Sequence, residues 1–466
     1  MIAFHLSRIR SGESVRLIDE INRLAGGLKS NGVIRIPPEI DVPITPRVRR
    51  LIDCPDVRRL KQISQLGLVS LVYPGATHSR WEHTLGVYRN ALRVLQLLAT
   101  QSHLSEIVDE RGAEAFVVAA IMHDVGHWPF CHPLEDIRMP FIPRHETRAG
   151  TIVRGERITE LMGNDWLCDA DDVMSILAKE PTGQTSLSAD AVSLLSSCLS
   201  GPVDIDKLDY LIRDSLHAGV PYGRNFDDAR LLHSLTIHPA KPRLAISEKG
   251  RTAAEMMVFA RYVMFSEVYW HHAVRSATAM LQRLVFEFDS RSMVADMFDQ
   301  TESAWIETVL HQSGASSWHH LANDLFGPAR RLYKRVAEFS VLDRGDLQRE
   351  LAHRPYWWLV ACADAIAVRC ASELRIDIKP GDILIDAPPV KLEVDINMDV
   401  VMRNGEIRTL ADVSPVAQSL AARQFDGHVK RVRIFVRPQW RDIVMPLMQN
   451  DRWIGEVIEA TEREVV

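Results

Sequence analysis

The sequence predicts a mainly α-helical protein with a small C-terminal α+β domain, and three observations support this fold class. Apolar residues recur at helical spacing over long stretches, as in Trp81 to Ala99 and Ala253 to Leu284. From Ile376 onward, short apolar or alternating runs lie between Gly and Pro residues, a pattern typical of strands. With 466 residues, 46% of them hydrophobic, the chain can fill a large core and a second domain.

The order of these patterns divides the chain into four parts. Residues 1–47 form an N-terminal segment, in which Val33 to Ile44 mostly alternates as a short strand would. Residues 48–290 form a helical core, residues 291–375 a helical extension, and residues 376–466 the small α+β domain. Arg-rich stretches at 49–59 and 430–437 fit solvated faces. The first could also contact a nucleotide or a neighbouring subunit, and the second a nucleotide effector or nucleic acid.

The overall composition excludes several classes of protein. The net charge of −6 gives no general indication of a nucleic-acid or membrane partner. The six Cys residues are scattered without a CxxC pair, which indicates reduced thiols rather than a disulfide framework. No signal-peptide pattern is present, and no apolar run reaches the ~20 residues of a membrane helix. We therefore expect a cytoplasmic protein.

The stretch from Ile121 to His132 organises the rest of the chain. It follows an apolar run, Phe116 to Met122, and places three His and one Asp within ten positions. Adjacent His and Asp are costly to bury without a partner, and a divalent cation removes that cost. Gly126 and Pro129 end the helix and turn the chain back, so the sequence predicts a metal site here rather than polar loop residues.

Two further stretches can complete such a site. Pro74 to Gly86 passes from a loop into a helix and contains Arg80 and His83. Val203 to Ala218 reads as a helix in which Asp206, Tyr210 and Asp214 share one face, which is unusual for a core helix.

The ordered motifs RxEH, HDxGHxPFxH and DxDKxDYxxRD resemble those of the HD phosphohydrolase superfamily, in particular its dNTP triphosphohydrolase (dGTPase-like) branch. The resemblance extends from about Ile36 to about Arg275. It implies that residues 48–290 are a helical HD-domain core that binds one metal through the side chains His83, His123, Asp124 and Asp206. Imidazole and carboxylate ligands suit a divalent transition metal (Mn, Fe, Ni, Co or Zn), and the nucleotide can bring an additional Mg ion.

The resemblance also implies catalytic roles. His145, in an Arg-His-Glu context after the central motif, is the candidate proton donor, since imidazole titrates near ~6.5. Arg80 and His127 would stabilise phosphate charge, with a structural salt bridge as the alternative for Arg80. Asp204 is either a plain helix N-cap or the acidic partner of a catalytic His.

The implied substrate contacts surround this centre. Gln65 and Leu66 match the pair that lies against the sugar in these enzymes, and an apolar Leu beside a 2′-hydroxyl would penalise ribose. Tyr269 aligns with a nucleotide-contacting Tyr, although its aromatic stripe equally fits a core helix, and Phe265 stands where some relatives have a further His. The remaining implied contacts are Arg80, His127, His132 and Lys207 for phosphate, Tyr210 beside the sugar and Asp214 for the 3′-hydroxyl.

The predicted reaction is metal-dependent hydrolysis of deoxynucleoside triphosphates to deoxynucleoside and inorganic triphosphate. Two alternatives are open: a nucleotidase or phosphodiesterase acting on other nucleotides, and a nucleotide-sensing regulatory protein with weak catalysis. Beside the nucleotide substrate, we expect a homo-oligomer and keep a nucleotide effector as a hypothesis; a membrane partner is not expected, and nucleic acid is not indicated.

Overall fold

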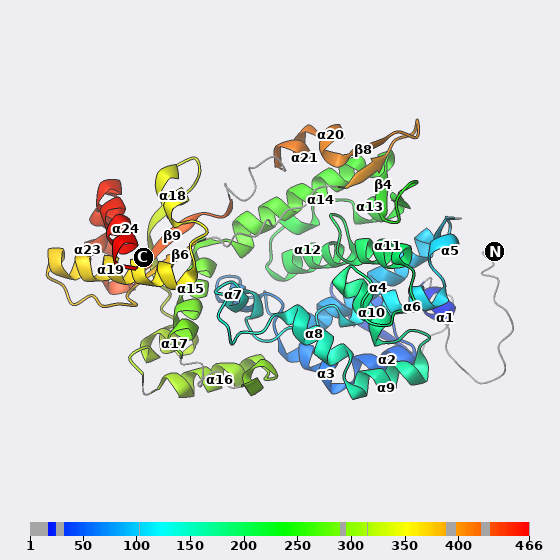
Figure 1. Cartoon of the computed structure of the whole chain (residues 1–466), viewed down its shortest axis with the longest axis horizontal. Coiled ribbons are helices and arrows are strands. Elements are labelled where there is room, and N and C mark those ends of the chain that lie inside the picture. The colour runs from blue at the N-terminus through cyan, green and yellow to red at the C-terminus, as the bar shows by residue number, and fades with distance from the viewer. Residues whose placement is uncertain are drawn as a thin grey trace.

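The computed structural model describes residues 17–24, 32–101, 103–288, 295–314, 316–387, 398–420 and 429–465. This part of the chain is mainly helical with small sheets, which confirms the predicted fold class. Figure 1 shows a larger lobe that contains most of the N-terminal helices, in blue to green, and a smaller lobe of yellow and red C-terminal elements.

The larger lobe is built around helix α4 (Arg80–Leu98), which packs against α6 (Glu110–Met122) and α12 (Ile205–His217). Side chains of Ser79, Asp109 and Asp204 cap the first turns of these three helices. From Phe116 to Met122, α6 is fully buried. The other helices up to residue 233 are α1 (Leu17–Leu24), α2 (Pro46–Ile52), α3 (Pro55–Arg58), α5 (Leu104–Ile107), α7 (Cys131–Glu135), α8 (His145–Val153), α9 (Glu156–Asp165), α10 (Ala170–Ala178), α11 (Ala189–Leu199) and α13 (Asp228–His233).

Gly86 allows α4 and α12 to approach closely. A Cβ atom at this position would lie 1.8 Å from a carboxylate oxygen of Asp209. Any larger residue would push the two helices apart, so the glycine lets the Asp209 side chain reach α4.

The predicted long helix Ala253 to Leu284 is interrupted. It consists of α14 (Arg251–Met264), a π-helical turn at Phe265–Tyr269, and α15 (His272–Phe286). The backbone N–H of Trp270 donates to the carbonyl oxygen of Phe265 at 2.8 Å, which closes the wider turn. Such turns are frequent at functional sites, and this one carries Tyr269.

The strands form three sheets in the described part of the chain. The predicted strand at Val33 to Ile44 is a hairpin of β1 (Val33–Ile36) and β2 (Ile40–Pro43). An antiparallel sheet in the smaller lobe has the order β5-β9-β6, and a second sheet, in the larger lobe, has the order β3-β4-β7-β8. Their bounds are β3 Leu235–Ile237, β4 Leu244–Ser247, β5 Lys334–Phe339, β6 Ile383–Asp386, β7 Asp399–Val401, β8 Ile407–Thr409 and β9 Val432–Val436.

Strand pairing differs from what the sequence predicts for the C-terminal part. Strand β5 lies within residues 291–375, which read as helical, and pairs with β9. Strand β7 pairs in parallel with β4, so residues 398–420 join the larger lobe rather than the sheet formed by β6 and β9. Residues 390–397 of the predicted strand Val390 to Val401 lie outside the described residues. Such pairings depend on hydrogen bonds between distant segments, which local patterns do not reveal.

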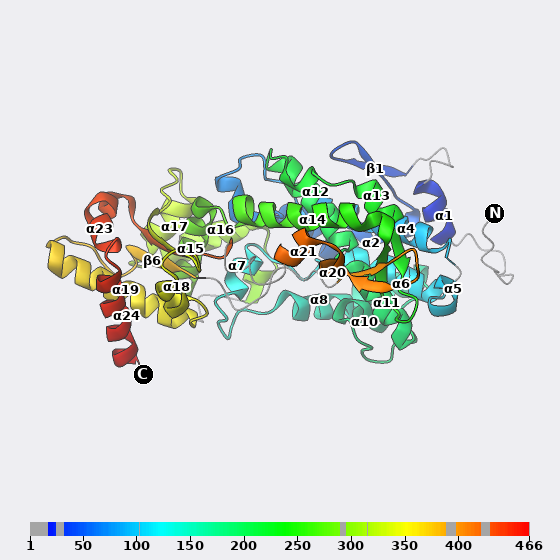
Figure 2. The same ribbon diagram turned by 90° about the horizontal axis from the view of Figure 1, so that it is seen from above.

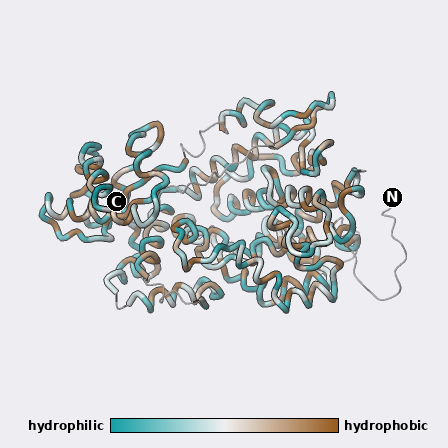
Figure 3. The backbone as a smooth tube through the Cα atoms, in the orientation of Figure 1, coloured by the Kyte–Doolittle hydropathy of each residue, from teal (hydrophilic) through white to brown (hydrophobic). Residues whose placement is uncertain are grey.

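Short helices cover these sheets. Seen from above in Figure 2, α20 and α21 lie along α14, with which they are in contact. Figure 3 shows that apolar and polar stretches alternate along the helices of both lobes, as expected when each helix turns one face to a core.

No helix in the described ranges is both long enough and apolar enough to cross a membrane. The C-terminal helices are α16 (Glu302–Ser313), α17 (His319–Phe326), α18 (Gly345–Leu351), α19 (Tyr356–Leu374), α20 (Leu410–Val413), α21 (Pro415–Ser419), α23 (Arg441–Met448) and α24 (Asp451–Val465).

Candidate active site

The four predicted metal ligands lie together where three helix ends meet. His83 is in the first turn of α4, His123 and Asp124 follow the last turn of α6, and Asp206 is in the first turn of α12. Nε2 of His83 lies 3.2 Å from Nε2 of His123 and 3.0 Å from a carboxylate oxygen of Asp206. A carboxylate oxygen of Asp124 lies 3.5 Å from Nε2 of His123. The donor atoms of His83, His123 and Asp206 all lie within 4.8 Å of one another, and this imidazole and carboxylate set fits one divalent transition metal, with Asp124 adjoining it at His123.

The electrostatic environment of these ligands favours a cation. Although burial lowers the pKa of His83, hydrogen bonds to Asp206 and Asp209 raise it to about 10. Burial raises the pKa of Asp124, but the neighbouring His127, His123 and Arg80 hold it well below its usual value. Carboxylates therefore remain ionised around the imidazoles, and this concentration of negative charge suits a bound cation.

A buried ion-pair network supports His83 from behind. Its Nδ1 lies 2.8 Å from a carboxylate oxygen of Asp209, which accepts two further hydrogen bonds from Arg213 at 2.8 and 2.7 Å. Arg213 in turn donates to Glu82 at 2.7 Å. Such outer contacts orient a ligating imidazole and set its tautomer. We did not predict Asp209 as a site residue, although its position one helical turn after Asp206 was a usable signal.

A second histidine group lies beside the first. Nδ1 of His127 is 3.2 Å from a carboxylate oxygen of Asp124, and Nε2 of His127 is 3.2 Å from Nε2 of His132. The ring centroids of His127 and His145 are 4.2 Å apart. The buried thiol of Cys131 lies close enough to His127 and His145 for the three groups to share an ion.

Glu135 holds His145 in this group. Its carboxylate accepts hydrogen bonds from the backbone N–H of His145 at 2.6 Å and from Nδ1 at 3.0 Å. Gly126 allows α8 to come this close, since a Cβ there would lie 2.1 Å from the carbonyl oxygen of His145. The sequence did not point to Glu135; its spacing of three residues from His132 was the available signal.

The contacts of three predicted residues decide between or limit their expected roles, and Asp204 has the N-cap role, one of its two alternatives. Asp204 is fully buried, caps α12, and accepts from Nζ of Lys207 at 2.5 Å, so it lies with the helix N-terminus rather than with His145. The Lys207 charge is correspondingly engaged by Asp204. Burial and the nearby Arg80 hold the pKa of His127 well below its usual value against the opposing effect of Asp124, so this imidazole is better suited to offer phosphate a hydrogen bond than a positive charge.

A cavity of about 650 Å³ is lined by His132 and His145 of the second histidine group, and Arg80 connects it to Asp124 of the first. Arg80 enters it from α4 and donates to Asp124 at 2.8 Å, while its Nε is buried without a hydrogen-bond partner. A volume of this size falls within the usual range for small-molecule sites. The predicted residues that line it are Gln65, Leu66, Arg80, His132, His145, Tyr210 and Tyr269, together with Phe265.

Asp214 lies behind the cavity wall rather than on it. The hydroxyl of Tyr269 donates to Asp214 at 2.6 Å, and Nε2 of His78 lies 2.9 Å from its other oxygen. Burial and the Asp214 charge raise the pKa of Tyr269 well above its usual value, so the phenol stays protonated. The pair therefore positions Tyr269 at the cavity, and the π-helical turn delivers it there.

The chain is similar to proteins of known families. Residues 226–449 match the family described as HD associated region. MJ1154 of Methanocaldococcus jannaschii is 28% identical over 392 residues, which cover 83% of this chain and 76% of that protein. The deoxynucleoside triphosphate triphosphohydrolase SAMHD1 of Gallus gallus is 26% identical over 285 residues, 56% of this chain and 46% of SAMHD1.

The fold is also found among solved structures. A phosphohydrolase from Bacteroides thetaiotaomicron, BT4208, superimposes with a TM-score of 0.65 at 23% identity. The match covers 87% of this chain and 100% of that structure. This likeness establishes a shared fold across nearly the whole chain.

Proposed function

Because residues 226–449 match the HD associated region and the chain is similar to deoxynucleoside triphosphate triphosphohydrolases, we propose that it is a metal-dependent hydrolase of deoxynucleoside triphosphates. The products would be deoxynucleoside and inorganic triphosphate. One observation carries the proposal: imidazoles and carboxylates from three helix ends converge, and Arg80 connects them to a cavity of nucleotide size.

The residues around the proposed metal site have different roles in hydrolysis. When bound by His83, His123, Asp124 and Asp206, the ion would polarise a phosphate oxygen and help to activate water. The buried, unpartnered Nε of Arg80 can donate to a phosphate oxygen of the substrate. His127 and half-exposed His132 can add hydrogen bonds to the same charge as it develops.

His145 is the proposed proton donor to the leaving oxygen. Its Nδ1 is engaged by Glu135, which leaves Nε2 available to the substrate. A carboxylate on one ring nitrogen fixes the ring orientation and favours proton transfer at the other. Glu135 therefore takes the role of a positioning residue.

Gln65 and Leu66 are the proposed sugar contacts. Both line the cavity and are half-buried, and Oε1 of Gln65 is buried without a hydrogen-bond partner. An apolar Leu66 leaves a 2′-hydroxyl unpaired, which supports a preference for deoxynucleotides. A homo-oligomer, a nucleotide effector and a cytoplasmic location stay predictions, and the particle mass with and without dGTP would test the first two.

Product analysis tests the proposal directly. The purified protein is incubated with each of the four dNTPs, GTP and dAMP, with Mn and with Mg, and products are resolved by mass spectrometry. We expect deoxynucleoside and inorganic triphosphate from dNTPs and little or no product from GTP. Phosphate released from dAMP alone would favour a nucleotidase, and no turnover of any dNTP mixture would favour a regulatory role.

A further inference from the structure

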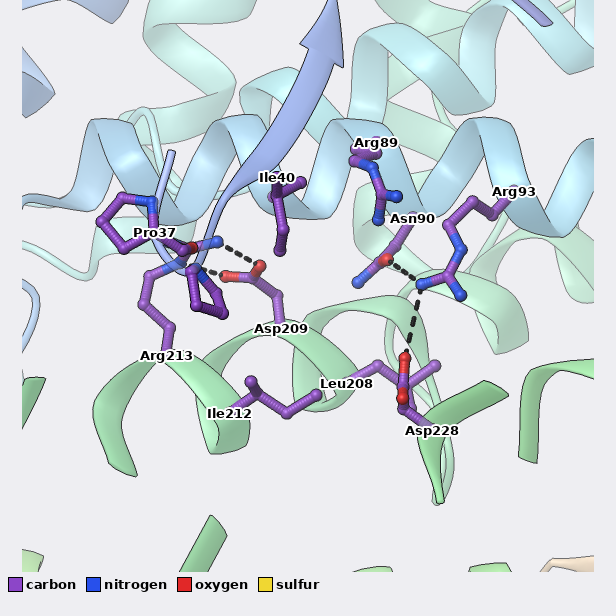
Figure 4. Close-up of a pocket in the computed structure, with 12 residues that line it drawn as sticks. Pro37, Ile40, Arg89, Asn90, Arg93, Leu208, Asp209, Ile212, Arg213 and Asp228 are labelled. Atoms are coloured by element: carbon purple, nitrogen blue, oxygen red, sulfur yellow. Dashed lines mark hydrogen bonds and ion pairs between the residues drawn. The ribbon is translucent and has the colours of Figure 1, made fainter. Parts of the chain in front are cut away.

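A second, smaller cavity lies behind the candidate metal centre. Its walls come from α4, α12, the start of α13 and the tip of the β1–β2 hairpin, as Figure 4 shows. Asp209 lines it and also contacts Nδ1 of His83, so the cavity adjoins the support of a metal ligand. The side chains that the argument uses are Arg89, Asn90, Arg93, Asp209, Arg213 and Asp228.

The size of this cavity restricts what it can hold. Its volume is about 60 Å³. Since one water molecule needs about 10–15 Å³ of such space, the cavity can hold about four waters or one tetrahedral oxyanion. A nucleoside would not fit inside, although a phosphate group carried by a larger molecule could enter from the solvent side.

The cavity contains a guanidinium group without a counter-ion. Within the described part of the chain, Arg89 makes no hydrogen bond or ion pair, and its Nε is buried without a partner. Figure 4 shows Arg89 directed from α4 toward α12, with no contact drawn to it. A buried polar group without a partner is costly, and a bound ion or water commonly explains such a group.

The other charges of the cavity do not neutralise Arg89. Arg213 and Asp209 pair with each other through two hydrogen bonds at 2.8 and 2.7 Å. Asp228 is 42% exposed and lies 3.6 Å from Arg93, a distance typical of a weak surface pair. Arg93 otherwise donates to the side-chain oxygen of Asn90 at 3.3 Å. Two arginines one helical turn apart therefore face one partly exposed carboxylate.

The acid–base properties of the two arginines agree with an excess of positive charge. Burial and then the neighbouring Arg93 lower the pKa of Arg89, against the opposing effects of Asp228, Asp209 and Asp41, of which Asp209 is paired with Arg213 and Asp41 with Arg35. Burial also lowers the pKa of Arg93, against the opposing effect of Asp228. An anion between the two guanidinium groups would relieve both the desolvation and the mutual repulsion.

We propose that this cavity is a binding site for a phosphate-type oxyanion, held between Arg89 and Arg93 and separate from the candidate active site. The anion is either free inorganic phosphate or one end of inorganic triphosphate, or the phosphate group of a nucleotide, and the remainder of the larger molecules stays outside the cavity. Arg89 supplies the principal contact because its forked donors are unused, and Arg93 supplies the second because Asp228 holds it only weakly.

Binding measurements on the full metal-loaded protein test this site. Inorganic phosphate, inorganic triphosphate and a deoxynucleoside monophosphate are titrated separately by isothermal calorimetry into wild type, Arg89→Met and Asp228→Asn. Because the candidate active site also binds phosphates, the site is identified by the difference between wild type and variants. Arg463→Met is the matched control, since Arg463 is 77% exposed on α24 and far along the chain from the cavity.

We expect Arg89→Met to weaken binding of at least one of these anions by about tenfold or more, because a charge-assisted contact is lost. Asp228→Asn should tighten the same binding severalfold by removing a competing carboxylate. Metal content and product formation should stay at wild-type levels in Arg89→Met, so the outcome is independent of the proposed hydrolase activity.

The three anions distinguish the sources of the phosphate group. Loss of inorganic phosphate or triphosphate binding in Arg89→Met supports a free anion, and loss of nucleotide binding alone supports a nucleotide-borne phosphate. If Arg89→Met does not fold, tightening in Asp228→Asn carries the test. Equal affinities of wild type, Arg89→Met and Asp228→Asn for all three anions would overturn the proposal.

Discussion

The two histidine groups of the candidate active site have the same spacing but different neighbours. Each contains a pair of imidazole Nε2 atoms 3.2 Å apart, His83 with His123 and His127 with His132. Around the first pair lie the carboxylates of Asp124, Asp206 and Asp209. Around the second lie the carboxylate of Glu135, an oxygen of Asp124 that contacts Nδ1 of His127, and the thiol of Cys131, whose pKa is raised by burial and by Glu135.

This difference teaches that the residue type alone does not decide the chemistry. The carboxylates of Asp206 and Asp209 beside His83 favour a cation, whereas Glu135 holds one ring nitrogen of His145 and so orients that imidazole for proton transfer. We therefore propose that the first group binds the metal and that the second contacts phosphate and transfers the proton. The following experiments would break or sharpen this assignment.

Substitutions in the first group should have the largest effect on metal binding and turnover. Asp206→Ala or His123→Ala should abolish metal binding and reduce turnover at least about a thousandfold, because the ion's stabilisation of phosphate charge is lost. Elemental analysis and product release measure the two quantities, with the exposed His103→Ala as control. Full activity in Asp206→Ala would contradict the assignment, as would a second metal equivalent that disappears in Cys131→Ala.

Substitutions in the second group should lower catalysis but leave the metal bound by the first group in place. His145→Ala is expected to lower kcat about 10²–10⁴-fold, which is the usual contribution of a positioned acid or base. Metal content should match wild type, and the neighbouring Glu146→Gln, at an exposed position, should have little effect. A variant that lost both metal and activity would place His145 among the ligands instead.

Arg80 contacts Asp124 of the first group and also lines the cavity. Its substitution therefore tests whether metal binding and catalysis can be separated. Arg80→Ala should retain the metal and lower turnover about a hundredfold, because a donor to the developing phosphate charge is removed. Arg80→Lys should recover part of the activity through its charge. Steady-state kinetics with elemental analysis distinguish this result from simple loss of the ion.

Leu66 tests substrate selection at the cavity. Leu66→Ser should raise kcat/KM for GTP relative to dGTP by about tenfold, because a hydroxyl partner becomes available to the 2′-hydroxyl. Leu66→Met preserves an apolar contact and serves as the control. An unchanged ratio in Leu66→Ser would remove this residue from sugar recognition.

The smallest effect concerns the stability that Glu135 contributes. Burial favours its neutral form, but hydrogen bonds from His132 and His145 hold the pKa of Glu135 below its ordinary value. Ionised Glu135 therefore stabilises the fold above the unfolded-state pKa near ~4.3, and this stabilisation is lost as the pH falls through the lowered folded-state pKa. Glu135→Gln should destabilise the protein by about 2 kcal/mol at neutral pH, with the difference shrinking below pH ~4. Urea unfolding at several pH values measures it, and a pH-independent difference would argue against this ion pair.

Much of the fold was predictable where the determining contacts are local. The helices α4, α6 and α12 each combine an apolar periodicity with a cap from a nearby Ser or Asp, so their existence follows from neighbouring residues. The resemblance placed the four expected ligands on the ends of these helices, and the structure brings the four side chains together. Glu135 and Asp209 escaped prediction because a lone acidic residue on a helix is usually solvated, and only the packing of another helix gives it a partner.

The sequence by itself determined the mainly helical class, the principal helices and the resemblance to HD phosphohydrolases, because periodicity, capping and motif spacing are properties of neighbouring residues. Only the tertiary structure decided that β5 pairs with β9, that β7 joins β4, and that a π-helical turn presents Tyr269 beside Asp214. It also decided that His83 meets Asp206 and Asp209, whereas His145 meets Glu135. Each of these outcomes depends on contacts between segments far apart in the chain, where burial and hydrogen bonding select one partner among many chemically equivalent ones.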